Sequence, residues 1–61
     1  MPEILIHLVE GRTPEKKKKV MAEITEVIVR NFEVPAENVV VQIIESSKDS
    51  KSRGGIPFSE R

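Results

Sequence analysis

Residues 13–31 read TPEKKKKVMAEITEVIVRN and carry the strongest structural signal in the chain. Thr13 offers an N-cap hydroxyl, Pro14 stands at the first helical position, where its missing N–H costs nothing, and Glu15 places an acid in the first turn. Apolar residues follow at helical spacing, namely Val20, Met21, Ile24, Val27 and Ile28. The pattern predicts an amphipathic helix that runs to about Asn31 and packs its apolar stripe on a sheet.

A β-strand is predicted on either side of this helix. Residues 2–9 read PEILIHLV and residues 39–45 read VVVQIIE, and both runs are β-branched and aliphatic on both faces. Pro35 biases Val34 toward extended geometry, which ends the helix before the second strand. A crossover that carries a helix joins parallel strands. The predicted fold is therefore α/β, a single β-α-β unit with parallel strands.

The length of the chain predicts assembly into an oligomer. Its 61 residues allow one domain, residues 1–61, and a chain this short buries only about 60% of the surface that its unfolded form exposes. The chain has no cysteine, so no disulfide can brace it. Two strands and one helix cannot close a core, and strands that are apolar on both faces need cover on both sides. We expect a homo-oligomer in which copies extend the sheet to at least four strands.

The charge balance argues against two classes of partner. Ten Lys and Arg residues balance ten Asp and Glu residues, which leaves no net field to attract nucleic acid or an anionic membrane. The apolar runs are a handful of residues long, far below the roughly 20 that span a bilayer. We expect a cytoplasmic protein without nucleic-acid or membrane partners.

Residues 46–61 differ in composition from the rest of the chain. Ten polar and glycine residues, SSKDSKSRGG, precede a short apolar hook, Ile-Pro-Phe, at residues 56–58. Such a tail is expected to be a flexible loop and arm, disordered alone and ordered by packing Ile56 and Phe58 on a neighbouring subunit. Gly54 and Gly55 are expected to turn the backbone at that contact.

Three features offer weak chemical signals. His7 is the only histidine and has no partners placed for a metal site, so a structural or interfacial role is favoured over catalysis. The lysines at 16–19 circle the helix without an aromatic or glycine-rich companion, which favours a solvated surface over a phosphate site. Gly54-Gly55 falls short of any phosphate-loop spacing. No metal and no cofactor are expected.

Pro2 is the residue with the clearest chemical potential. Methionine followed by proline is commonly trimmed during synthesis, and trimming would leave a free secondary amine at the start of a buried strand. An apolar pocket lined by a cation lowers the pKa of such an amine, because desolvation and a nearby Arg both disfavour its charged form. A general base works best when its pKa lies near the operating pH. The plain alternative is a proline that merely begins an edge strand.

The arrangement of these features resembles the 4-oxalocrotonate tautomerase family over almost the whole chain. The features that carry the resemblance are Pro2 after the initiator, the strand from Ile4 to Val9, the turn Glu10-Gly11-Arg12-Thr13, the Lys-rich helix, the Val/Ile strand and the Gly54-Gly55 pair. The resemblance implies a β-α-β protomer that pairs into dimers and assembles as a trimer of dimers. It also implies an enol–keto tautomerase that needs no cofactor and acts on a small 2-oxo acid or dienol carboxylate.

The site residues that the resemblance implies are partly altered in this chain. Pro2 matches the acid/base and Arg12 the cation that binds a substrate carboxylate, while Val9, Val40 and Lys51 match further substrate-binding positions. Val40 stands where well-known members carry a second arginine, and losing one such donor typically costs on the order of 10²-fold or more. Lys51 stands where they carry an aromatic pocket wall, and a cation there could hold an acidic substrate. Arg53 is another candidate for that role.

Two other functions are compatible with the sequence. A non-catalytic assembly subunit fits Val40, Lys51 and an unprocessed Met1, because a Pro2 nitrogen that is acylated by Met1 is an amide and cannot accept a proton. Hydrolytic dehalogenation of a haloacrylate, a reaction of the same superfamily, would need an additional carboxylate to activate water. The carboxylates available for that reaction are Glu3, Glu10 and Glu45.

Overall fold

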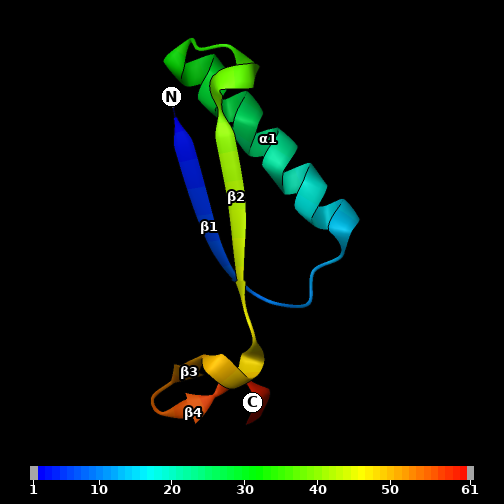
Figure 1. Ribbon diagram of the computed structural model, residues 1–61, viewed down its shortest axis with the longest axis vertical. Coiled ribbons are helices and arrows are strands. Elements are labelled where there is room, and N and C mark those ends of the chain that lie inside the picture. The colour runs from blue at the N-terminus through cyan, green and yellow to red at the C-terminus, as the bar shows by residue number, and fades with distance from the viewer. Residues whose placement is uncertain (1, 61) are drawn as a thin grey trace.

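The computed structural model describes residues 2–60 and has the predicted β-α-β order (Figure 1). Strand β1 (Glu3–Val9) leads into helix α1 (Pro14–Phe32), a short 3₁₀ turn η1 (Ala36–Asn38) and strand β2 (Val40–Ser46). β1 and β2 pair in parallel, as the helical crossover predicts. Each strand starts one residue later than the sequence predicts, β2 also ends one residue later, and the helix runs one residue beyond Asn31.

The two ends of α1 follow from local chemistry. The Thr13 hydroxyl accepts a hydrogen bond from the Lys16 N–H at 3.3 Å, and Pro14 occupies the first turn. At the other end Glu33 adopts the left-handed conformation, with φ of 57°, and its N–H donates to the Val29 carbonyl at 3.0 Å. That position is normally held by glycine, because a Cβ is strained there.

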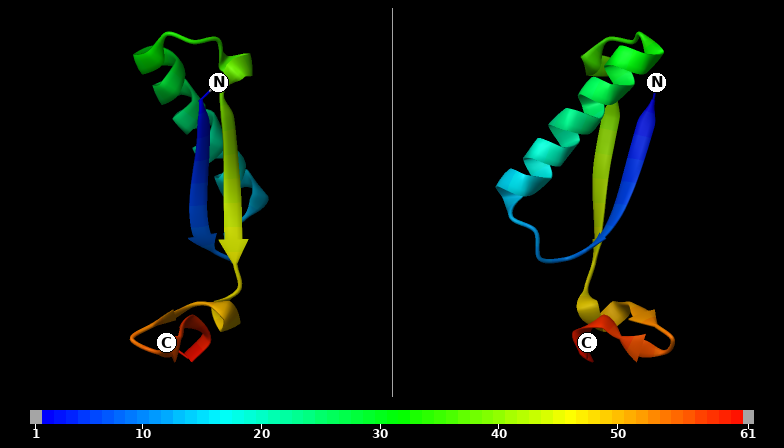
Figure 2. Two further views of the ribbon diagram at one scale, coloured as in Figure 1. Left: turned by 60° about the vertical axis from the view of Figure 1, so that its left-hand side comes forward. Right: turned by 180° about the vertical axis from the view of Figure 1, so that it is seen from behind.

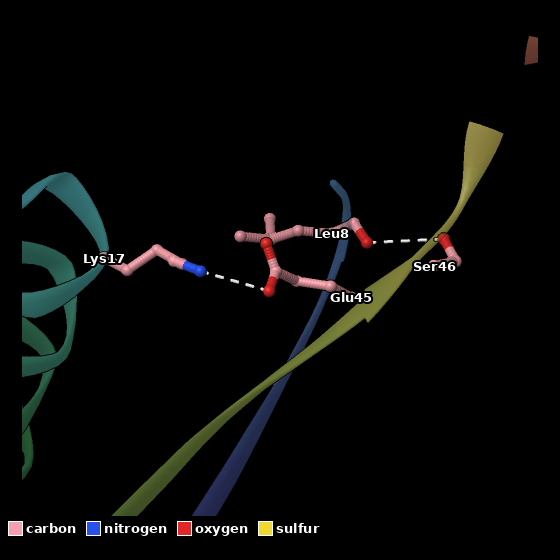
Figure 3. A network of polar contacts seen from close by, with 4 residues as sticks. All are labelled: Leu8, Lys17, Glu45 and Ser46. Carbon is pink, nitrogen blue, oxygen red and sulfur yellow. Dashed lines mark hydrogen bonds and ion pairs between the residues drawn. The ribbon is translucent and has the colours of Figure 1, made fainter. Parts of the chain in front are cut away.

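One face of the two-stranded sheet carries the helix (Figure 2). The register pairs Ile4 with Val41, Ile6 with Ile43 and Leu8 with Glu45, and these pairs face α1. An ion pair joins α1 to the sheet near the carboxyl end of β2, where the Lys17 ammonium lies 3.1 Å from a Glu45 carboxylate oxygen (Figure 3). Beside it the Ser46 hydroxyl donates to the Leu8 carbonyl at 3.3 Å and ties the strands together.

The apolar stripe of the helix is only partly covered, which corrects the prediction that the whole stripe packs on the sheet. Met21, Ile24 and Ile28 are half-buried, whereas Val20 and Val27 remain 40% and 44% exposed. The reason is geometric, since strands lie about 4.8 Å apart and two of them are narrower than an apolar stripe of about 100° on a helix. Val20 therefore overhangs the sheet next to β1, where it lines a concavity with Ile6 and Leu8.

Nothing in residues 2–60 covers the opposite face of the sheet (Figure 2). Leu5 is 52% exposed there and Val40 is 36% exposed. Among residues 2–60 no side chain reaches full burial, and the principal extents are 43 × 22 × 13 Å. A layer this thin presents apolar surface on both sides, so it fits the expected oligomer better than an isolated protomer.

The C-terminal arm, which we define as residues 47–60, contains short regular elements where the sequence predicts a flexible loop. Two short 3₁₀ turns, η2 (Lys48–Ser50) and η3 (Phe58–Glu60), flank a small hairpin of β3 (Ser52–Arg53) and β4 (Ile56–Pro57). Gly54 and Gly55 form its two-residue loop with φ of 61° and 82°, as a type I′ turn requires. The arm lies beyond the carboxyl ends of β1 and β2 (Figure 1).

Candidate functional site

Pro2 lies at the amino end of β1, half-buried beside an apolar strand start. Its carbonyl accepts a hydrogen bond from the Val40 N–H at 3.0 Å, which fixes the strand end against β2. Val40 and Leu5 lie on the sheet face that α1 leaves open. Met1, whose removal the chemistry of Pro2 requires, lies outside the described residues. The contact that holds Pro2 is therefore a backbone hydrogen bond to β2.

Arg12 lies at the other end of the same strand. It follows the turn at Glu10 and Gly11, where Gly11 has φ of 123° and the Glu10 N–H donates to the Ser46 carbonyl at 2.9 Å. Arg12 is exposed and lines a concavity of about 220 Å³ between α1 and β1, whose other lining residues are Ile6, Leu8, Lys16, Lys17, Val20 and Ile43. At about 3.3 Å per residue, β1 separates Pro2 from the strand end before Arg12 by about 23 Å.

The remaining predicted site residues divide between the same two ends. Val40 lies beside Pro2, whereas Val9 ends β1 on the side of Arg12. Lys51 belongs to the arm beyond the carboxyl ends of the strands (Figure 1). One chain therefore presents two separate halves: the proline and Val40 at one end, and the cations Arg12 and Lys51 at the other.

The three carboxylates considered for water activation have different surroundings. A Glu10 carboxylate oxygen accepts a hydrogen bond from the Lys48 N–H at 3.1 Å and so anchors the base of the arm. Glu45 is paired with Lys17. Glu3 is exposed and follows Pro2 directly in the chain. Of these acids, Glu3 is the one next to the proline.

Two features of the arm and the helix layer were not recognised from the sequence. The ring of Phe58 lies under two cations, the Lys51 ammonium and the Arg53 guanidinium. A second concavity, of about 420 Å³, opens between α1 and β2 and is lined by Pro14, Lys17, Met21, Val41, Gln42, Ile43 and Glu45. The spacing Lys51-x-Arg53 before a Gly-Gly turn was the available signal for the first feature.

Residues 2–60 contain no group of three or more His, Cys, Asp or Glu side chains placed to hold a metal ion. In the same part of the chain, α1 is too polar to be a membrane-crossing helix, and no other helix qualifies.

Comparison with known proteins identifies the family. The family model described as "Tautomerase enzyme" matches residues 2–61. A probable tautomerase from Bradyrhizobium diazoefficiens is 46% identical over 61 residues, which cover all of this chain and 91% of that protein. The 2-hydroxymuconate tautomerase of Pseudomonas sp. strain CF600 is 33% identical over 60 residues, which cover 98% of this chain and 95% of that one.

Solved structures agree with the sequence relatives. A 4-oxalocrotonate tautomerase homologue superposes with a TM-score of 0.94 at 36% identity, covering 100% of this chain and 97% of the other. A heterohexamer 4-oxalocrotonate tautomerase from Chloroflexus aurantiacus gives a TM-score of 0.88 at 28% identity, with 98% and 97% coverage. Fold, sequence and family model point to one conclusion, and the resemblance noted in the sequence is confirmed: the chain belongs to the tautomerase family.

Proposed function

We propose that this protein is an enol–keto tautomerase of small 2-oxo acids or dienol carboxylates, with a trimmed N-terminal Pro2 as its acid/base. The relatives named above as tautomerases support isomerase activity for the family. The observation that carries the proposal is the position of Pro2, half-buried at the start of β1, where its carbonyl accepts the Val40 N–H. An amine in such a place is easier to keep neutral than one in water, and a neutral amine can accept a proton.

The site is proposed to form between copies of the chain. Because β1 separates Pro2 from the strand end that precedes Arg12 by about 23 Å, the two residues lie toward opposite ends of the strand, and we propose that a small substrate meets them from different copies. The thin protomer leaves apolar surface on both sides, which favours assembly. A hexamer built as a trimer of dimers follows the family pattern, and the Chloroflexus aurantiacus relative is itself a heterohexamer. In this arrangement residues 47–60 contribute to the contacts between subunits.

The proposed reaction is a proton shuttle. The neutral Pro2 nitrogen takes the proton of the enol hydroxyl, and the electron pair of the O–H bond becomes the new carbonyl π bond. Arg12 of another copy binds the substrate carboxylate and favours negative charge that develops toward it. The resulting prolinium then returns its proton to a carbon of the dienol, which completes the ketone and restores the amine. Val9 and Val40 form apolar parts of the pocket wall.

The first experiment measures the ketonisation of 2-hydroxymuconate and enolphenylpyruvate by protein whose trimmed N-terminus has been verified by mass. Pro2→Ala and Arg12→Ala should each lower kcat/KM by at least about 100-fold, because the first replaces the ring-held secondary amine by a freely rotating primary amine and the second removes the cation that binds the carboxylate. Arg30→Ala is the matched control, since Arg30 is an exposed arginine in the last turn of α1. Full activity of Pro2→Ala would end the proposal.

A mixing experiment tests whether the site is shared. Chains carrying Pro2→Ala and chains carrying Arg12→Ala are unfolded together and refolded as mixed oligomers. If each site takes its proline and its arginine from different copies, about a quarter of sites in an equal mixture hold both groups, so part of the activity returns. A site built within one chain would recover nothing, and that result would contradict the shared arrangement.

Two observations favour other functions, and each of these functions can be tested. Val40 beside Pro2 leaves the proline without a cation from its own strand pair, which suits a non-catalytic assembly subunit. That function predicts a hexamer without turnover even after Met1 is removed. Glu3 is the carboxylate next to Pro2, which suits hydrolytic dehalogenation, and chloride release from 3-chloroacrylate that is lost in Glu3→Gln would support it.

A further inference from the structure

Glu10, which follows β1 directly, is held at two points by the end of β2 and the residues after it. Its N–H donates to the Ser46 carbonyl at 2.9 Å. One of its carboxylate oxygens accepts a hydrogen bond from the Lys48 N–H at 3.1 Å. A single bond fixes where a residue lies, whereas a backbone bond and a side-chain bond together also fix how it is oriented. The chain therefore leaves β1 at Glu10 in one defined orientation.

The Glu10 carboxylate acts as the cap of η2. Lys48 is the first residue of η2, and the first N–H groups of a helical turn have no acceptor within it. Ser47 precedes η2 but supplies no side-chain cap, and its hydroxyl donates instead to the Ser50 hydroxyl at 2.9 Å. Glu10, 38 residues before Lys48, supplies the missing acceptor. Because this acceptor is ionised, the hydrogen bond is stronger than one to a neutral oxygen.

The turn from Glu10 to Thr13 carries Arg12 between two anchors. Thr13 belongs to the start of α1, where its carbonyl accepts the Lys17 N–H at 3.1 Å. Gly11 has φ of 123°, a conformation that other residues rarely adopt, and glycine also adds freedom to the chain. Arg12 is exposed, and within residues 2–60 its guanidinium forms no ion pair. The direction in which Arg12 is presented therefore depends on the anchors at Glu10 and Thr13.

The Glu10–Lys48 contact admits two roles. In the first, it only holds the base of the arm against the end of the sheet, where the arm and the turn with Arg12 lie at the same end of the molecule (Figures 1 and 2). In the second, it also limits the freedom that Gly11 gives to Arg12. The order of the residues favours the second role, because the two-point anchor stands directly before the glycine.

We propose that Glu10 is a positioning residue for Arg12. Its carboxylate touches no reacting atom in the proposed arrangement and acts through the turn, by fixing the residue from which Gly11 and Arg12 depart. The inference rests on the proposed function and deepens it, because it assigns the group that holds the substrate-binding arginine in place. It also gives the Glu10 carboxylate a role other than the activation of water.

A double-mutant cycle tests whether Glu10 acts through Arg12. In trimmed protein that keeps Arg12, Glu10→Ala should lower kcat/KM for 2-hydroxymuconate by about three- to tenfold, as expected for the loss of one hydrogen bond. In an Arg12→Ala background the same change should alter kcat/KM by less than about twofold, because no guanidinium remains to be misplaced. Equal losses in the two backgrounds, or no loss in the first, overturn the inference.

A conservative variant and a matched control separate positioning from general damage. Glu10→Gln keeps an acceptor oxygen at the same distance from the backbone and should retain kcat/KM within about twofold. Glu23→Ala removes an exposed glutamate of α1 and should leave kcat/KM unchanged. Light scattering verifies that each variant has the oligomeric state of the unmodified protein. A Glu10→Gln protein as impaired as Glu10→Ala overturns the role of the acceptor oxygen.

The donor side of the contact can be removed through the backbone. Ser47 has φ of −74° and ψ of 153°, which suits a residue before proline, and proline is tolerated at the first position of a helical turn. Lys48→Pro therefore removes the N–H, whereas Lys48→Ala keeps it and serves as the control. Lys48→Pro should reproduce the loss of Glu10→Ala and add nothing to it in the double variant. Equal effects of Lys48→Pro and Lys48→Ala overturn the inference.

An exchange measurement judges the contact without turnover. Amide hydrogen exchange followed by NMR should be several-fold faster at the Lys48 N–H in Glu10→Ala than in the unmodified protein and in Glu10→Gln. Equal exchange in all three proteins overturns the inference. Activity that survives Pro2→Ala overturns the proposed function instead. If Pro2→Ala is inactive but the Glu10–Arg12 cycle is additive, the proposed function stands and the positioning role of Glu10 falls.

Discussion

The open sheet face predicts that folding depends on protein concentration. A compact monomer of 6.9 kDa is expected to expose about 4,000 Å². This chain exposes 4853 Å², an excess of about 850 Å² that is close to the area of roughly 800 Å² that each partner covers in a standard interface. The excess includes Leu5, which is 52% exposed in the centre of β1 on the uncovered side.

The perturbation that tests this point is Leu5→Ala. Fully burying a leucine side chain contributes about 1.5–3 kcal/mol, and about half of this side chain is still exposed in the single chain, so its loss should cost about 1 kcal/mol per copy. Two copies that meet through this face lose about 2 kcal/mol together, which corresponds to about a 30-fold rise in the dissociation constant of the pair. Glu23→Ala, on the exposed side of α1, should leave that constant nearly unchanged.

The assay is sedimentation equilibrium combined with far-ultraviolet circular dichroism over a dilution series. Helical signal and assembled mass should fall together on dilution, and Leu5→Ala should shift that transition to higher concentration. A Leu5→Ala protein that dissociates at the same concentration as the unmodified chain would refute the role of this face. An unmodified chain that sediments as a helical 6.9 kDa monomer at micromolar concentration would refute the reasoning from surface area.

Two further predictions concern the ends of α1 and use urea unfolding at one fixed protein concentration. Thr13→Ala should lower the free energy of unfolding by about 1 kcal/mol, because the Lys16 N–H loses its capping hydroxyl. Thr13→Ser keeps a hydroxyl at this position and should retain the stability of the unmodified protein. Equal stability of Thr13→Ala and the unmodified protein would contradict the role of the cap. Glu33→Gly should raise the free energy of unfolding by roughly 0.5–1 kcal/mol, because the left-handed strain it relieves exceeds the entropy that glycine adds to the unfolded chain. Glu33→Ala keeps the strain, so equal stabilisation by Ala and Gly would disprove that cause.

The local elements of the fold could be predicted because their signals are local. The Thr13 cap and Pro14 define the start of α1 within three residues of sequence, and the crossover helix dictates parallel pairing of β1 with β2. The cover of Val20 and Val27 could not be predicted in the same way. It depends on how wide the sheet is, which is a property of the assembled layers and not of helical spacing.

In the arm and in the site, too, some features could be predicted from the sequence and others could not. The Gly54-Gly55 turn was recognised as a turn, but the hairpin around it depends on the backbone pairing and on Phe58, which lie outside what composition reports. Pro2 and Arg12 were singled out from residue type and family resemblance. The predicted strand already sets these two residues toward its opposite ends, and the structure adds the concavity between α1 and β1 that Arg12 lines.

The hydrogen bond from the Lys48 N–H to the Glu10 carboxylate, at the base of the arm, also has a consequence for how the sequences of relatives can diverge. The Lys48 N–H that binds Glu10 is a backbone group, so every residue except proline at position 48 can supply it. Many substitutions in the hairpin should therefore leave the stability of the β-α-β unit unchanged. The sequence of the arm can then vary among relatives without destabilising that unit. Exchanging residues 51–58 between members of the family is, by the same logic, a practical route to chimaeras with altered selectivity.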